Sequence, residues 1–336
     1  MGRATCWKIA ERAEPHSGMT EERDSKGRPA FLLPWRLVLL LFAVSGLAAG
    51  FAAMSAGQHT VPGAFAGMIL GFFGTIFGDR VRTILAIFCV TIASLATDMA
   101  PAWVSFYALA PAFAIIAGAE LARFGSRVSV FAIMSWITLN SPATSTADTP
   151  SLLLVFMASA FAGTILVLVL KLEGRVPPTP VERGYAIAHG SALAIGLILS
   201  QIIASQFDNA NSHWIALLFA ARALDPPGSH IEQARSRGTA MVLGAGAASA
   251  LVMLPIITAL FQVMAVALLI VGLRYLPSGQ WIAPALMSAG IVLATSPTTE
   301  TAVFRAEAAV IASGLVLLVF FLARAIRRRL LENRGV

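Results

Sequence analysis

The chain has 336 residues, of which 57% are hydrophobic and only 12% are charged. This balance excludes a soluble domain, because soluble domains carry about 25% charged residues. The net charge of +7 does not indicate nucleic-acid binding, since the basic residues lie at the ends of apolar segments rather than in a basic domain of their own. Cys6 and Cys89 are too few for a disulfide framework or a metal cluster.

Residues 1–30 are polar and charged and lack apolar periodicity, so they are expected to form a disordered cytoplasmic tail. They do not read as a signal peptide, because no short apolar core is followed by a small-residue cleavage site. Met1 and Met19 both stay open as the start residue.

Twelve apolar segments divided by short polar breaks follow this tail. They lie at 37–55, 63–77, 83–97, 102–119, 128–139, 152–170, 185–205, 214–224, 238–254, 256–273, 282–294 and 303–323. Several are shorter than the roughly 20 residues that a helix needs to cross the hydrocarbon core. We therefore predict twelve transmembrane helices, with ten as the alternative.

The charges in the breaks alternate in a way that supports twelve spans. With the N-terminus in the cytoplasm, every internal break carries Lys or Arg, whereas the external breaks carry none. Four acidic residues fall in the external breaks, namely Asp98, Asp148, Asp208 and Glu300. Arg305 departs from this rule, because it opens the last segment from the external side; we interpret it as an interfacial anchor.

Two parts of the chain match each other at an offset of 155 residues. Residues 141–147 and 296–302 share five of seven identities, and Arg80 and Arg82 fall on Arg235 and Arg237. Internal repeats are common in transporters. Since six is an even number of spans, both halves begin on the same side of the membrane, and the repeats are expected to be parallel.

The expected organisation is an all-α integral membrane protein with both termini in the cytoplasm. The disordered tail 1–30 precedes a first six-helix repeat at 31–172. A proline-rich cytoplasmic linker at 173–184 leads to the second repeat at 185–325, and a basic cytoplasmic tail at 326–336 ends the chain.

Glycines recur along the second apolar segment at spacings of three and four. They are Gly63, Gly67, Gly71, Gly74 and Gly78. On a helix they form one face almost without side chains, which predicts close helix packing. A mobile or substrate-lining helix is the alternative.

The stretch 213–228 is where we expect the chemistry. A short apolar helix reaches Arg222 and Asp225 and is then broken by two prolines and a glycine. An ionisable residue at membrane depth is a candidate functional residue, and such a break needs protein or water around it. Arg222 is the candidate counter-charge for a carboxylate, with Asp225 as its partner or a proton carrier. The structural alternative is that Arg222 extends to the cytoplasmic surface and pairs with Asp225.

The remaining candidates lie at the two membrane surfaces. The arginine pairs predicted at the cytoplasmic side would either anchor to lipid phosphates or concentrate an anionic substrate in a vestibule. The candidate substrate-contacting residues are Arg222, Asp225, His213, Trp214, Arg80, Arg82, Arg235 and Arg237. The proton-coupling candidates are Asp225, His213 and His59; for the histidines, simple hydrogen bonding to neighbours is the alternative.

The same stretch carries a family resemblance. His213-Trp214 opens a short helix, Asp225-Pro226-Pro227 breaks it, and 235–244 reads Arg-Ser-Arg-Gly-Thr-Ala-Met-Val-Leu-Gly. This pattern resembles the fusaric acid resistance and aromatic acid exporter family over roughly 214–254, and more weakly, through the repeat, in the first half. The resemblance implies a bacterial inner-membrane efflux protein for aromatic or other organic acids, driven by the proton gradient. Some members act with a periplasmic adaptor protein, and many carry large cytoplasmic domains that this sequence lacks.

We therefore expect a transporter that exports small organic anions and contacts membrane lipids, with no enzymatic activity, cofactor, metal or nucleic acid. No phosphate-cradling loop, nucleophile triad or metal-ligand cluster is recognisable in the sequence. An organic-anion channel is the alternative within transport, since plant organic-anion channels have a similar six-helix unit. A non-transporting scaffold for envelope assembly is the alternative outside it.

Overall fold

The computed structural model describes eight stretches of the chain, namely 32–100, 104–175, 180–207, 211–222, 231–254, 257–276, 280–296 and 298–332. Within them the regular structure is helical, without a strand. The expected tail 1–30 and the middle of the expected linker lie outside these stretches, as does Asp225.

In the first half, the main helices are α2 (Trp35–Ala56), α3 (Val61–Phe77), α4 (Arg80–Met99), α6 (Ala110–Phe124), α7 (Val128–Leu139) and α8 (Thr149–Val169). Short helical turns precede three of them, namely η1 (Gln58–Thr60), η2 (Ser105–Leu109) and η3 (Pro142–Thr144). Asp79 and Asp148 begin α4 and α8, because each carboxylate accepts a hydrogen bond from the backbone N–H three residues later. Gly125 ends α6 in the left-handed conformation, at φ 65°.

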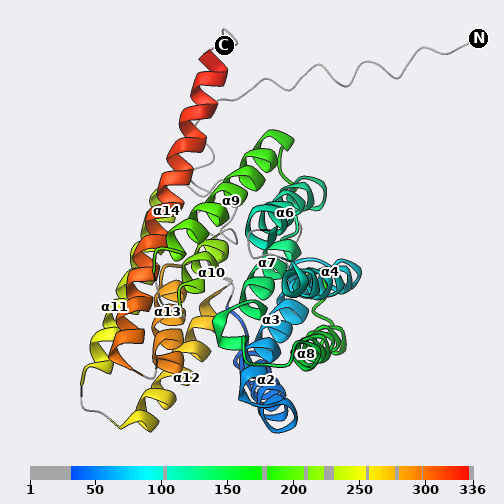
Figure 1. Cartoon of the computed structure of the whole chain (residues 1–336), viewed down its shortest axis with the longest axis vertical. Coiled ribbons are helices and arrows are strands. Elements are labelled where there is room, and N and C mark those ends of the chain that lie inside the picture. The colour runs from blue at the N-terminus through cyan, green and yellow to red at the C-terminus, as the bar shows by residue number, and fades with distance from the viewer. Residues whose placement is uncertain are drawn as a thin grey trace, which may run out of the picture.

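In the second half, the helices are α9 (Arg183–Ala204), α10 (His213–Arg222), α11 (Ile231–Val252), α12 (Thr258–Tyr275), α13 (Ile282–Thr295) and α14 (Thr299–Glu332). Each of the twelve predicted apolar segments therefore overlaps a helix. α14 continues without a break past residue 326, where the basic tail was expected to begin, and projects beyond the other helices at its C-terminal end (Figure 1).

Seven helices of the described chain are long and apolar enough to cross a membrane. They cover 35–56, 58–77, 80–99, 107–124, 149–169, 183–204 and 299–319. α7, α12 and α13 are apolar but shorter. The predicted class, an all-α multi-pass membrane protein, is confirmed at this level.

Apolar side chains cover the outside of the bundle. α2 exposes Leu47 and Phe51, and α4 exposes Leu85 and Ile92. Such surfaces suit contact with lipid tails rather than with water. α3 differs, because most of its length is buried among other helices. Side chains from both halves of the chain belong to the largest buried apolar cluster.

The glycine face of α3 packs directly on α8. A Cβ atom on Gly67 would lie 2.2 Å from the carbonyl oxygen of Phe156, and one on Gly71 would lie 1.9 Å from that of Ala160. Both distances are far below van der Waals contact, so only glycine allows the two backbones to approach this closely. The helix-packing interpretation of these glycines is confirmed.

The two halves meet along α6 and α9, which run antiparallel. Gly118 of α6 faces Ala186 and Gly190 of α9, and Gly190 in turn faces Ala114. α10 extends this interface because it packs on α7 as well as on α9. The halves meet again at α2 and α12, where the Arg274 guanidinium lies 4.1 Å over the Trp35 ring.

Candidate functional site

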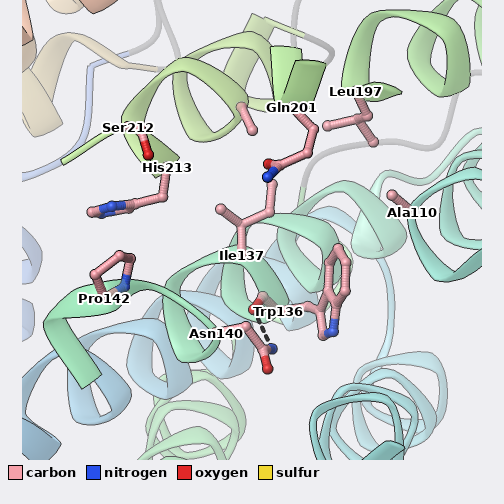
Figure 2. Close-up of a pocket in the computed structure, with 10 residues that line it drawn as sticks. Ala110, Trp136, Ile137, Asn140, Pro142, Leu197, Gln201, Ser212 and His213 are labelled. Carbon is pink, nitrogen blue, oxygen red and sulfur yellow. Dashed lines mark hydrogen bonds between the residues drawn. The ribbon is translucent and has the colours of Figure 1, made fainter. Parts of the chain in front are cut away.

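A cavity of about 170 Å³ lies between the two halves of the chain. Residues of α6, α7, η3, α9 and the start of α10 line it, namely Ala110, Trp136, Ile137, Asn140, Pro142, Leu197, Gln201, Ser212, His213 and Ala216. Figure 2 shows His213 and Gln201 approaching from the second half, opposite Ile137, Asn140 and Pro142 of the first. The site therefore depends on both halves being packed together.

The first-half wall of this cavity is held by hydrogen bonds. The Asn140 side-chain amide donates to the Trp136 carbonyl oxygen at 2.8 Å and to the Ser94 hydroxyl at 3.3 Å. The Trp136 indole N–H donates to the Thr97 hydroxyl at 3.2 Å. The wall thus combines a fixed amide with a fixed aromatic ring.

The cavity can accept a small molecule that is partly aromatic and partly polar. Trp136, Ile137 and Leu197 are apolar, whereas Asn140, Gln201, Ser212 and His213 supply amide, hydroxyl and imidazole groups. Such pockets bind ligands by apolar contact and orient them with a few polar groups. Among the described residues, those that line the cavity include no Lys, Arg, Asp or Glu.

Two predicted residues, His213 and Trp214, lie at this cavity or directly beside it. His213 lines the cavity. Trp214 is half-buried next to it, with its ring centroid 5.6 Å from that of His213. His59 is exposed on η1 and does not line the cavity, although η1 packs against η3.

Arg222 lies at the opposite end of α10 from His213, and only 9% of it is exposed. One of its terminal nitrogens, Nη2, lies 3.5 Å from the point where a Cβ on Gly238 would be, and the Ser313 hydroxyl oxygen lies 3.5 Å from the same point. Arg222 thus lies against α11 inside the bundle, on the side of Gly238 that also faces Ser313 of α14. Trp214 and Arg222 are separated by roughly 12 Å along α10, at 1.5 Å per residue.

The predicted arginine pairs differ in their surroundings. Arg80 and Arg235 are exposed, whereas Arg237 is buried. Arg82 is occupied by structural contacts, because it pairs with Asp79 at 3.2 Å and donates to the Ser126 hydroxyl at 3.1 Å. Its guanidinium also lies 3.6 Å over the Phe124 ring. Arg82 is thus engaged within its own half, whereas Arg80 and Arg235 are exposed, and the anion-concentrating vestibule stays a prediction.

Sequence reasoning missed the first-half wall of the cavity. Trp136 and Asn140 of that wall, like Gln201 on the second-half side, carry no local motif, and they come together only through helix packing between the halves. Arg305 was expected to be an interfacial anchor, yet only 7% of it is exposed. The one feature of the sequence that set Arg305 apart was its departure from the charge alternation.

No protein-family model, curated protein or solved structure matches this chain. The resemblance to the aromatic acid exporter family, carried by His213-Trp214 and the segments after it, therefore stays a prediction. What stands on the structure is the all-α multi-pass membrane class, with a cavity between the halves and buried arginines in the second half.

Proposed function

We propose that this protein is a bacterial inner-membrane transporter that exports small organic anions, aromatic carboxylates above all, in exchange for protons. One observation carries the proposal: α10 begins at the cavity with His213 and ends with the buried Arg222. A short helix with a cationic residue at one end and a titratable, cavity-lining residue at the other suits a route for an anion.

Twelve spans in two parallel repeats are part of the same proposal. The helix pairs α2–α3, α3–α8, α4–α8 and α4–α7 of the first half have counterparts at the same places in the second half, namely α9–α10, α10–α14, α11–α14 and α11–α13. The contacts between the halves also follow the repeat, because the contact of α6 with α9 is equivalent to the contact of α12 with α2. The shorter helices would cross only part of the membrane and be shielded by their longer neighbours.

The repeat also points to the second half as the substrate side. At the offset of 155 residues, Arg222 corresponds to Gly67. Gly67 lies against the backbone of α8 and leaves no room for a side chain. The guanidinium at the equivalent place instead lies close to Gly238 of α11. The repeat would thus supply packing in one half and an anion counter-charge in the other.

In the proposed mechanism, Arg222 attracts a carboxylate that has entered from the cytoplasm, where the exposed Arg80 and Arg235 raise the local anion concentration. His213 is the proton-coupling group, because its imidazole lines the cavity. Asp225 stays a candidate proton carrier or partner of Arg222, outside the described residues. A periplasmic adaptor protein is the partner that the family resemblance implies on the external side.

The first test is transport by the Arg222→Ala variant. Inverted membrane vesicles with an acidic lumen should accumulate labelled benzoate when they carry the wild-type protein. We expect the variant to lower this rate about tenfold or more, because a charge-assisted contact is worth about 1.5–3 kcal/mol. The exposed Arg36→Ala is the matched control and should transport normally.

Unchanged transport by Arg222→Ala would remove Arg222 from the mechanism. The channel alternative is separated by collapsing the proton gradient, since a channel continues to conduct down an anion gradient. Neutral benzoic acid that leaks through the lipid accumulates on the more alkaline side, which is outside these vesicles. Passive leakage therefore cannot imitate the expected accumulation in the acidic lumen.

A further inference from the structure

Arg305 is a buried cation near the N-terminal end of α14. It lies six residues after the first residue of the helix, Thr299, and only 7% of it is exposed. Burying a charge is costly unless it is paired and hydrogen-bonded. The groups around Arg305 therefore show whether its charge and its hydrogen-bond donors are fully paired within the protein.

In the stretches that the structure describes, every partner of Arg305 is uncharged. Its Nη1 donates to the Ser296 hydroxyl at 2.8 Å and to the Thr295 hydroxyl. Its Nη2 makes one long contact, at 3.5 Å, with the Asn211 amide oxygen. The guanidinium also lies 4.8 Å from the centre of the Trp214 ring. Among the described residues, no carboxylate forms an ion pair with it.

The unused donors of Arg305 are those that suit a carboxylate. Its Nε is buried and has no hydrogen-bond partner within the described part of the chain. Since both hydroxyl bonds come from Nη1, Nε–H and one Nη2–H are left, and this edge of a guanidinium can hold both oxygens of a carboxylate. Trp214 adds an aromatic surface beside the same group.

We propose that Arg305, Ser296, Asn211 and Trp214 form a binding site for a planar organic carboxylate near the outer end of the second half. Arg305 supplies the counter-charge, Asn211 and Ser296 hold the guanidinium in place, and Trp214 packs against the organic part of the ligand. The site takes one carboxylate, and an aromatic ring next to that carboxylate favours binding.

The site is adjacent to the cavity between the halves. Asn211 and Trp214 bracket Ser212 and His213, both of which line that cavity. Arg222 lies at a separate position. It is close to Gly238, which faces Ser313 of α14, and Ser313 is roughly 12 Å from Arg305 along that helix at 1.5 Å per residue. The second half thus has two cationic positions along the contact between α10 and α14.

The inference rests on the proposed function only for its choice of an aromatic carboxylate as the probe. Equilibrium binding of labelled benzoate to the purified full chain in detergent tests it, with benzamide, which has no carboxylate, as the ligand control. We expect Arg305→Gln to weaken benzoate binding on the order of 10- to 100-fold, the range expected when a charge-assisted hydrogen bond is lost. The matched control, Arg36→Gln, replaces an exposed arginine and should bind as the wild type does.

Wild-type affinity in Arg305→Gln would overturn the inference, and so would the absence of benzoate binding to the wild type. If Arg305→Gln does not fold, Arg305→Lys decides. Lysine keeps the charge but lacks the two parallel donors, so we expect binding to weaken about five- to tenfold, whereas unchanged affinity would overturn the site.

Failure of this site and failure of the transport proposal give different results. Binding needs neither a membrane nor a proton gradient, so binding without transport contradicts export and leaves the Arg305 site standing. Transport by the wild type together with unaltered binding in Arg305→Gln overturns the site alone.

Discussion

At the residue scale, the buried Glu120 of the first half and the buried Arg305 of the second half differ in how well they are hydrogen-bonded. Glu120 of α6 is buried, and both of its carboxylate oxygens accept hydrogen bonds. The donors are the Val128 and Ser129 backbone N–H groups, at 3.0 and 2.7 Å, and the Ser126 hydroxyl. Glu120 therefore caps the start of α7, where those N–H groups have no partner within the helix. Arg305, in contrast, keeps a buried donor without a partner among the described residues.

Replacing Glu120 should accordingly affect stability. We expect Glu120→Ala to lower the free energy of unfolding by about 1–3 kcal/mol, because two backbone donors and a hydroxyl lose their acceptor. Thermal unfolding of the detergent-solubilised protein, followed by tryptophan fluorescence, measures the change. Glu307→Ala, at an exposed position of α14, is the control and should unfold as the wild type does. An equal midpoint for both variants would show that the cap is not needed.

The residue scale also marks the limit of what the sequence could predict of the site. His213 and Trp214 were identified because they open the short helix that ends at a recognisable break, and the structure brings His213 to the cavity. Arg305 was interpreted as an interfacial anchor because it opens the last apolar segment, whereas its partner Asn211 lies 94 residues away in the chain. Such a contact arises from helix packing, which a single sequence does not report.

At the scale of helices, apolar length predicted the elements well and their ends less well. α7 has its predicted bounds, 128–139, because Arg127 and Asn140 flank an uninterrupted apolar run. α11 begins at Ile231 rather than at residue 238, and α14 begins at Thr299 rather than at residue 303. Charged and polar residues end an apolar run without ending a helix, so hydropathy located the membrane segment and not the helix termini.

The contact between α3 and α8 gives a prediction at this scale. We expect Gly71→Ala to destabilise the protein by about 1–3 kcal/mol or to prevent its folding, because the added methyl would meet the Ala160 carbonyl oxygen. Gly50→Ala on α2 is the matched control, since no described atom lies within 4 Å of its Cβ position. Thermal unfolding compares the two variants. A Gly71→Ala protein as stable as Gly50→Ala would mean that α3 and α8 lie further apart.

At the scale of the whole molecule, the two halves differ in the residues that they place at their helix contacts. The first half places a glycine face where α3 meets α8, and the second half places Arg222 and Arg305 along α10 and α14. The cavity lies between the halves and takes its walls from both. Under the proposed transport function, movement of one half relative to the other would reshape this cavity.

The most direct test of proton-coupled export uses the purified wild-type protein in liposomes with an acidic interior. We predict that benzoate accumulates inside above its external concentration, and that dissipating the pH gradient abolishes the accumulation. Protein-free liposomes should exclude benzoate under the same gradient. Entry that never exceeds the external concentration, or no entry beyond that of protein-free liposomes, would contradict the proposed function.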